Sequence, residues 1–158
     1  MRTTVALALA FFGLSSFSDA QTSQPFTLEI AAVHETLHKG EPVEIDIKTT
    51  NTTSEDIKLS KSNPAMEYEF DVRDAQGRPA AETALLKRIK DTSHPFVIYR
   101  LTKEILKPHQ SSTERVNMSD YFDLSVPNTY SIGINRQLPK PLGAGIVKSN
   151  TVVITITP

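Results

Sequence analysis

The chain has no cysteine and no tryptophan among its 158 residues. Without cysteine it forms no disulfide, and it offers neither a thiol nucleophile nor a thiolate ligand for a metal ion. A lipid anchor attached to cysteine is excluded for the same reason. The fold therefore depends on packing and other non-covalent interactions, without a covalent cross-link.

An excess of charge of either sign is also lacking, since 17 lysine and arginine residues stand against 18 aspartate and glutamate residues. A chain with a formal net charge of -1 has no electrostatic attraction to nucleic acid or to an anionic membrane surface. Its densest basic cluster, Lys87, Arg88 and Lys90, contains no aromatic residue and is interpreted as a solvated face. We expect no nucleic-acid partner.

Long apolar runs are confined to the N-terminus. Arg2 precedes an apolar stretch from Val5 to Leu14, and small residues follow up to Ala20, as a signal peptidase requires. The stretch is shorter than the roughly 20 residues that a membrane-spanning helix needs. We therefore predict a signal peptide over residues 1–20, cleaved after Ala20, and a secreted or periplasmic protein with no membrane insertion after cleavage. An uncleaved anchor is the alternative.

Removal of 20 of the 158 residues leaves 138, the size of one domain. A domain of this size buries about two thirds of the surface that its unfolded chain exposes, which is enough for a core without disulfides. The sequence shows no internal repeat, low-complexity segment or long linker. Residues 21–158 are predicted to form one monomeric domain.

What the sequence has in abundance is alternation of apolar and polar residues. Val43, Ile45 and Ile47, for example, alternate with charged residues. Such alternation is typical of strands with one buried and one solvated face. With weaker candidates at 57–60, 96–105 and 112–118, it predicts an all-β fold, an immunoglobulin-like antiparallel β-sandwich of about seven to nine strands. The clearest alternating stretches are 26–33, 43–50, 66–74, 130–136 and 152–158.

Residues 66–74 also contain closely spaced carboxylates. Met66 begins the inward, apolar face of this predicted strand, and Glu67, Glu69 and Asp71 lie on the opposite face. Paired carboxylates are the residues of general acid–base catalysis. A strand needs polar residues on its outer face, however, and we assign these three to solvation.

Two proline turns carry more specific information. Pro108 is followed by His109, at a position where glycine would be the easy choice. Pro127 presets φ at the second position of a turn, and Asn128 tolerates the left-handed conformation that a type II turn requires at the third. Tyr130 follows at the start of a strand, where the ring of a tyrosine corner points inward and its hydroxyl bonds to upstream backbone.

Helical signals are weak. Residues 80–88 have helical propensity, but the stretch is short and shows no cap, so an edge strand or a single turn is expected. Residues 120–124 are expected to form one helical turn between two strands. Asn51, in an Asn-Thr-Thr sequon, is interpreted as a turn residue.

Several of these pieces resemble a known type of domain in their order. They are TTNTTSEDIKL, YEFDVRDAQGRP, LKPHQSS and VPNTYSI, within residues 43–136. They resemble secreted bacterial immunoglobulin-like or fibronectin-type-III-like domains of unknown function, and are more distantly similar to the intracellular proteinase inhibitor family of bacilli. In that family glycine follows both turn prolines, where His109 and Asn128 stand here. The resemblance implies the fold, and protease inhibition as an alternative function, but no inhibitory residue maps onto this chain.

Residues 34–38, HETLH, fit the H-E-x-x-H pattern of zinc metalloproteases. That pattern requires a helix, on which both histidines converge on one ion and the glutamate activates the metal-bound water. Here the preceding residues alternate as a strand, and Gly40 and a proline follow at once. In an extended chain His34 and His38 lie about 13 Å apart, at about 3.3 Å per residue. We interpret the segment as a solvated loop, with a zinc metalloprotease using His34, Glu35 and His38 as an alternative.

Other candidate sites rest on fewer residues. A third zinc ligand would have to come from His94, His109 or a carboxylate. No G-x-S-x-G motif marks a serine nucleophile. Because hard cations bind clustered oxygens, four aspartates could contribute to a calcium site. They are Asp74, Asp91, Asp120 and Asp123.

We predict an exported, non-catalytic binding or structural module that recognises another protein or a cell-surface polymer, with no cofactor, catalytic residue or bound metal. In such folds the sheets position the loops, and the loops carry the function. The longest irregular stretches, 86–96 and 137–147, are the candidate recognition loops. The second contains a Gly143-Ala144-Gly145 hinge and is expected to be exposed and flexible.

Overall fold

The computed structural model describes residues 24–91 and 101–158. The predicted signal peptide and His94 lie outside these ranges, and so do parts of the predicted strand at 96–105 and of the predicted loop at 86–96. The described residues form ten β-strands, two short α-helices and two 3-10 helices. The all-β class is confirmed, with one strand more than the expected seven to nine.

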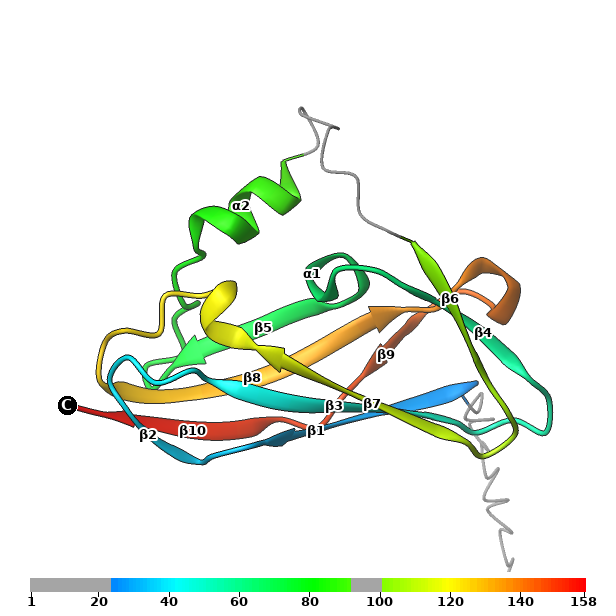
Figure 1. Cartoon of the computed structure of the whole chain (residues 1–158), viewed down its shortest axis with the longest axis horizontal. Helices are drawn as coiled ribbons and strands as arrows, with labels where there is room; N and C mark the ends of the chain where they lie inside the picture. Colours follow the sequence, from blue (N-terminus) through cyan, green and yellow to red (C-terminus); the bar gives the residue numbers. More distant parts are fainter. Residues whose placement is uncertain (1–23, 92–100) are drawn as a thin grey trace, which may run out of the picture.

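The strands follow the alternating stretches of the sequence. They are β1 (Phe26–Ala32), β2 (Thr36–His38), β3 (Glu44–Asn51), β4 (Ile57–Lys61), β5 (Glu69–Asp74), β6 (Thr102–Leu106), β7 (Ser111–Asn117), β8 (Asn128–Gln137), β9 (Ile146–Lys148) and β10 (Val152–Thr157). One sheet has the order β1-β3-β7, and the other has the order β2-β10-β8-β5, with β9 beside β8. The two sheets form the layers of a sandwich (Figure 1). Neighbouring strands are antiparallel, except that β2 runs parallel to β10.

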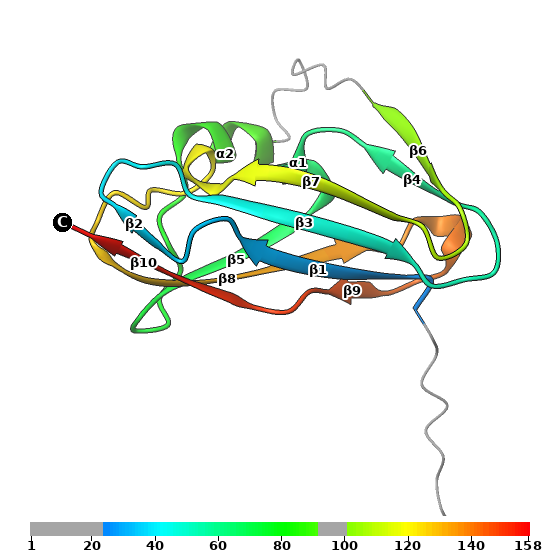
Figure 2. The ribbon, with the colours of Figure 1, turned by 60° about the horizontal axis from the view of Figure 1, so that its bottom comes forward.

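A third, two-stranded ladder joins β4 and β6. Figures 1 and 2 show this ladder and helix α2 (Ala84–Lys90) toward opposite ends of the same side of the sandwich. Helix α1 (Pro64–Glu67) lies between them. These elements, together with the 3-10 helix η1 (Met118–Asp120), lie on the side of the sandwich where β7 and β5 are the edge strands of the two sheets.

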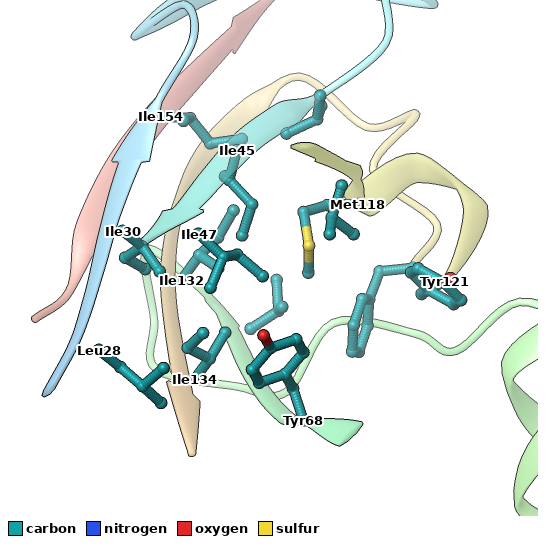
Figure 3. Packing of buried hydrophobic residues seen from close by; sticks show 14 of the residues in the cluster. Leu28, Ile30, Ile45, Ile47, Tyr68, Met118, Tyr121, Ile132, Ile134 and Ile154 are labelled. Carbon is teal, nitrogen blue, oxygen red and sulfur yellow. The ribbon is translucent and has the colours of Figure 1, made fainter. Parts of the chain in front are cut away.

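The apolar side chains of the alternating strands meet between the sheets. Figure 3 shows Ile45 and Ile47 of β3 facing Ile132 and Ile134 of β8. All four are at most 1% exposed, and burial of each such side chain contributes about 1.5–3 kcal/mol. Because the chain forms no disulfide, this core is the main source of its stability.

The alternating stretch at 66–74 divides into a helix and a strand. The side chain of Asn63 caps helix α1, and Pro64 follows at a first-turn position. Met66 therefore lies on a helix and is 56% exposed. The prediction that it faces inward is wrong, although β5 then follows the expected alternation from Glu69 onward.

Residues 80–88 contribute to a helix, so the prediction of an edge strand or a single turn is wrong. The Thr83 hydroxyl accepts a hydrogen bond from the Leu86 backbone N–H at 3.3 Å and thereby caps α2. The same hydroxyl donates to the Asp120 carbonyl at 2.7 Å. Leu86 is 1% exposed and packs into the core. The helix is thus held by contacts with residues that are distant in sequence.

The turn at Pro108 has the predicted geometry. His109 adopts a φ of 62°, in the left-handed region that glycine enters most easily. The Gln110 N–H donates to the Lys107 carbonyl at 3.0 Å and closes the turn between β6 and β7.

The turn at Pro127 differs in part. Among the residues that the structure describes, His109 is the only non-glycine residue with a positive φ, so the left-handed conformation predicted for Asn128 is wrong. Asn128 instead begins β8 and pairs with β10. The tyrosine corner is confirmed, because the buried Tyr130 donates its hydroxyl proton to the Val126 carbonyl at 3.0 Å.

Asn51 is the last residue of β3, so the prediction of a turn residue is wrong for its backbone; its completely buried side chain organises the turn that follows. Its amide donates to the carbonyls of Glu55, Leu106 and Lys107 at 2.7–3.0 Å, and its oxygen accepts from the Thr53 N–H. One side chain therefore fastens the β3–β4 connection to the end of β6.

Candidate functional site

The HETLH segment is extended. Its last three residues form β2 beside β10, and Leu37 is buried in the core. The prediction that the segment is not a helix is confirmed, whereas the prediction of a loop is wrong for β2. The side chains of His34 and His38 are exposed. Within residues 24–91 and 101–158, no group of three or more histidine, cysteine, aspartate or glutamate side chains could hold a metal ion.

The aspartates considered for calcium have local roles. Asp91 is the C-cap residue of α2, and the other three accept hydrogen bonds from nearby side chains. The donors are Arg78 to Asp74 at 2.8 Å, Asn117 to Asp120 at 3.1 Å, and Ser125 to Asp123 at 2.6 Å. These contacts organise turns and do not converge on one cation position.

The two predicted recognition loops are more regular than expected. The first begins inside α2, which continues to Lys90. The second contains the 3-10 helix η2 (Lys140–Leu142) and β9, and the Leu138 N–H donates to the Gly145 carbonyl at 2.9 Å. Gly143 has a φ of 113°, a backbone conformation that glycine adopts more easily than residues with a side chain. The prediction of a wholly irregular 137–147 stretch is wrong.

A pocket of about 700 Å³ lies at the end of the sandwich where α2 begins, and we call it the end pocket. Residues of three segments that are distant in sequence line it: 40–42, 81–83 with Lys87, and Asn117, Ser119 and 122–125. Figure 2 shows the β2–β3 connection beside η1 and near α2. Sequence patterns mark none of these segments as neighbours, because each belongs to a different connection of the fold.

One wall of the end pocket is a short antiparallel pairing. The Thr83 N–H donates to the Tyr121 carbonyl at 2.9 Å, and the Asp123 N–H donates to the Ala81 carbonyl at 2.8 Å. These two bonds hold the segment before α2 against the segment after η1. The wall therefore has a defined backbone even though it consists of connections.

The opposite wall is the turn between β2 and β3. Gly40 adopts a φ of 92°, which favours glycine at this position. The Glu41 carboxylate accepts a hydrogen bond from the His38 N–H at 2.6 Å. The Val43 N–H donates to the Ser119 hydroxyl at 3.2 Å and ties this wall to η1.

The end pocket combines apolar and charged lining groups. Phe122 and Leu124 form its deep side, and each is only 5% exposed. Hydrogen bonds from Ser125 lower the pKa of Asp123, so this carboxyl stays ionised. The charged side chains of the lining are Glu41, Glu82, Lys87 and Asp123.

A second cluster of charged groups lies near the other end of the fold, and it is buried. The Arg136 guanidinium donates to the Ser60 carbonyl at 2.7 Å and to the Glu67 carboxylate at 3.1 Å. The side chains of Arg136 and Glu67 are both 5% exposed, so the prediction that Glu67 is solvated is wrong. Burial raises the pKa of Glu67, while the neighbouring Arg136 acts in the opposite direction.

Tyr68 extends this cluster to β7. Its hydroxyl donates to the Glu114 carboxylate at 2.5 Å, and Lys61 pairs with the same carboxylate at 2.7 Å. Burial raises the pKa of Tyr68, which keeps the phenol neutral as a donor. Perturbed groups of this kind can mark a functional site. Here they bind one another and hold β4, β7 and β8 together, so the cluster is structural.

A scan against protein-family models finds no match to the chain, and a search of curated proteins finds none similar to it. No helix in the described part of the chain is long and apolar enough to cross a membrane. Function is therefore inferred from the geometry and chemistry of the site itself.

Proposed function

We propose that the protein is an exported, non-catalytic binding module that holds a partner protein at the end pocket. The observation that carries this proposal is a hollow of about 700 Å³, with a partly apolar lining, formed by three connections on a rigid sandwich. Concave sites with an apolar base and a few polar groups are the usual form of a binding site. Connections on a rigid scaffold are also where such folds carry recognition.

The hydroxyl groups of the lining support binding without catalysis. The Ser119 hydroxyl accepts from the Val43 N–H, and the Ser125 hydroxyl donates to Asp123 within the same turn. A serine nucleophile needs a general base that takes its proton and is itself oriented by a third group. Neither of these two lining serines has that arrangement.

An immunoglobulin-like arrangement is part of the proposal. It is supported by the strand orders β1-β3-β7 and β2-β10-β8-β5 and by the tyrosine corner at Tyr130. Export is supported by the apolar stretch that follows Arg2 and by the small residues up to Ala20.

The proposal is tested by capturing partners from the native envelope fraction with purified protein in which the end pocket is filled. Ala81 is exposed and lines the pocket, and its carbonyl, not its side chain, makes the bond to Asp123. Ala81→Trp therefore fills the pocket while this backbone bond is kept. Ala75→Trp, on the exposed turn after β5, is the matched control. We expect the wild type and Ala75→Trp to retain a partner that Ala81→Trp loses. Equal capture by all three proteins would refute the proposal.

A further inference from the structure

We infer that the end pocket accepts a lysine or arginine side chain presented by the partner protein, an inference that rests on the proposed function. Three properties of the pocket support it: the sign of its charge, the availability of its carboxylates and the apolar surface beside them. Each of these is a property of residues that the structure describes.

The charge of the lining is predominantly negative. Three carboxylates, Glu41, Glu82 and Asp123, stand against one ammonium group, Lys87. The remainder of the lining is uncharged. A partner group with a positive charge is therefore attracted, and an acidic group is repelled by the majority of the charges.

Two of the three carboxylates are available for a partner. Among residues 24–91 and 101–158, neither Glu41 nor Asp123 forms an ion pair. Each accepts only local hydrogen bonds, from His38 in the first case and from Ser125 in the second. A carboxylate has about four lone-pair positions, so both retain capacity for another donor.

The third carboxylate shows how an ammonium group is bound at this rim. Glu82 holds the Lys90 ammonium at 2.5 Å, across one side of α2. The partner side chain would bind Glu41 and Asp123, the two lining carboxylates that hold no ammonium group within the described residues, in the same manner. Lys87 opposes it, because this positively charged residue also lines the pocket.

The apolar lining fits the stem of a basic side chain. Lysine and arginine carry a charged head on an apolar chain, which they lay along apolar surface while the head stays polar. Pro42 and Ala81 are exposed apolar residues of the two walls, and Phe122 and Leu124 lie beneath them. Carboxylates at the rim with apolar surface alongside match this combination more closely than they match a small inorganic cation.

The experiment is an NMR titration of the ¹⁵N-labelled protein with hexalysine, and separately with hexaglutamate, at low salt. We expect hexalysine to shift amide signals of residues 40–42, 81–87 and 117–125 in a saturable manner, and hexaglutamate to leave them in place. Glu41→Gln combined with Asp123→Asn keeps the local hydrogen-bond acceptors but removes both charges. This variant should weaken hexalysine binding by about fourfold or more, at about two- to fivefold for each exposed pair.

Two single variants complete the design. Lys87→Gln should tighten hexalysine binding by about twofold, because it removes the opposing charge. Glu55→Gln is the matched control, since Glu55 is an exposed carboxylate on the β3–β4 connection outside the pocket, and it should change nothing. The inference is overturned if hexalysine does not shift the pocket amides, if the double variant binds it equally well, or if hexaglutamate binds there.

These outcomes are distinguishable from failure of the proposed function. If hexalysine does not bind but Ala81→Trp still loses the envelope partner, the pocket recognises another chemistry and only this inference fails. If Ala81→Trp retains the partner, the proposed function itself fails, whatever the peptides do.

Discussion

Among single residues, the buried arginine of β8 shows most clearly how the core tolerates charge. Arg136 continues the inward row of β8 after Ile132 and Ile134, so alternation alone places it inside. Its partner Glu67 was not predictable as a buried residue, because alternation assigns it to the solvated face and helix α1 reverses that assignment. Burial of an ion pair is acceptable only when the remaining polar groups are also bonded. In the described part of the chain, no buried side-chain nitrogen or oxygen lacks a hydrogen-bond partner.

Arg136→Met is expected to lower the free energy of unfolding by about 3–5 kcal/mol, because it leaves the Glu67 carboxylate buried without its counter-charge. Urea unfolding monitored by circular dichroism measures this loss. The double variant Arg136→Met with Glu67→Leu removes both charges and should recover part of the stability. A double variant no more stable than Arg136→Met alone would contradict the assignment of a buried ion pair.

The raised pKa of Glu67 predicts a specific dependence of stability on pH. Burial raises the pKa of this carboxyl in the folded state above its value in the unfolded chain. The folded state therefore takes up a proton first as the pH falls, and the wild type gains stability relative to Glu67→Gln as the pH falls through the raised folded-state pKa toward the unfolded value of about 4.3. Unfolding free energies of the two proteins across this range give the difference directly.

Asp46 provides a comparison of opposite sign. A hydrogen bond from Arg115 on the outer face of the β3–β7 pair lowers the pKa of Asp46. The stability that this interaction gives the folded state is fully present above the pKa of Asp46 in the unfolded chain. It is lost as the pH falls through the lowered pKa of the folded state, so the wild type loses stability relative to Asp46→Asn in acid. If the stability differences of Glu67→Gln and Asp46→Asn from the wild type changed with pH in the same direction, the opposite pKa shifts assigned to Glu67 and Asp46 would be wrong.

Among the secondary-structure elements, the long strands were predicted correctly, whereas the short strand β2 and the short helix α1 were missed. Alternation is a local signal, and it correctly predicted β1, β3, β8 and β10. β2 has only three residues and pairs with a strand about 120 residues later, so no local pattern announces it. For α1 a local signal existed, since asparagine followed by proline is a common helix start.

Helix α2 depends on a cap that also builds the end pocket. Thr83→Ala removes the hydroxyl that accepts from the Leu86 N–H and donates to the Asp120 carbonyl, and it is expected to cost about 1–2 kcal/mol. Thr83→Ser keeps both bonds and should retain most of the stability. Thermal and urea unfolding of the two variants provide the test, and equal stability of Thr83→Ala and the wild type would show that the cap is dispensable.

At the level of the whole molecule, the end pocket could not be predicted from the sequence. Its lining comes from connections near residues 40, 82 and 120, and Lys87 is the only described residue that it shares with the predicted recognition loops. Only the closing of the sandwich brings these connections together, through the Thr83–Tyr121 and Val43–Ser119 bonds. The glycine turn at Gly40, the carboxylates and the Phe-Asp-Leu segment are all visible in the sequence, but their proximity in space is not.

The most direct measurement of recognition at the end pocket is site-specific photo-crosslinking in the native host. A photoreactive amino acid placed at position 81 faces the pocket, and the same residue at position 75 lies on the exposed turn after β5. If the end pocket binds a partner protein, position 81 forms a discrete crosslinked product, and position 75 does not. A partner crosslinked from position 75 but not from position 81 would show that the end pocket is not the binding site.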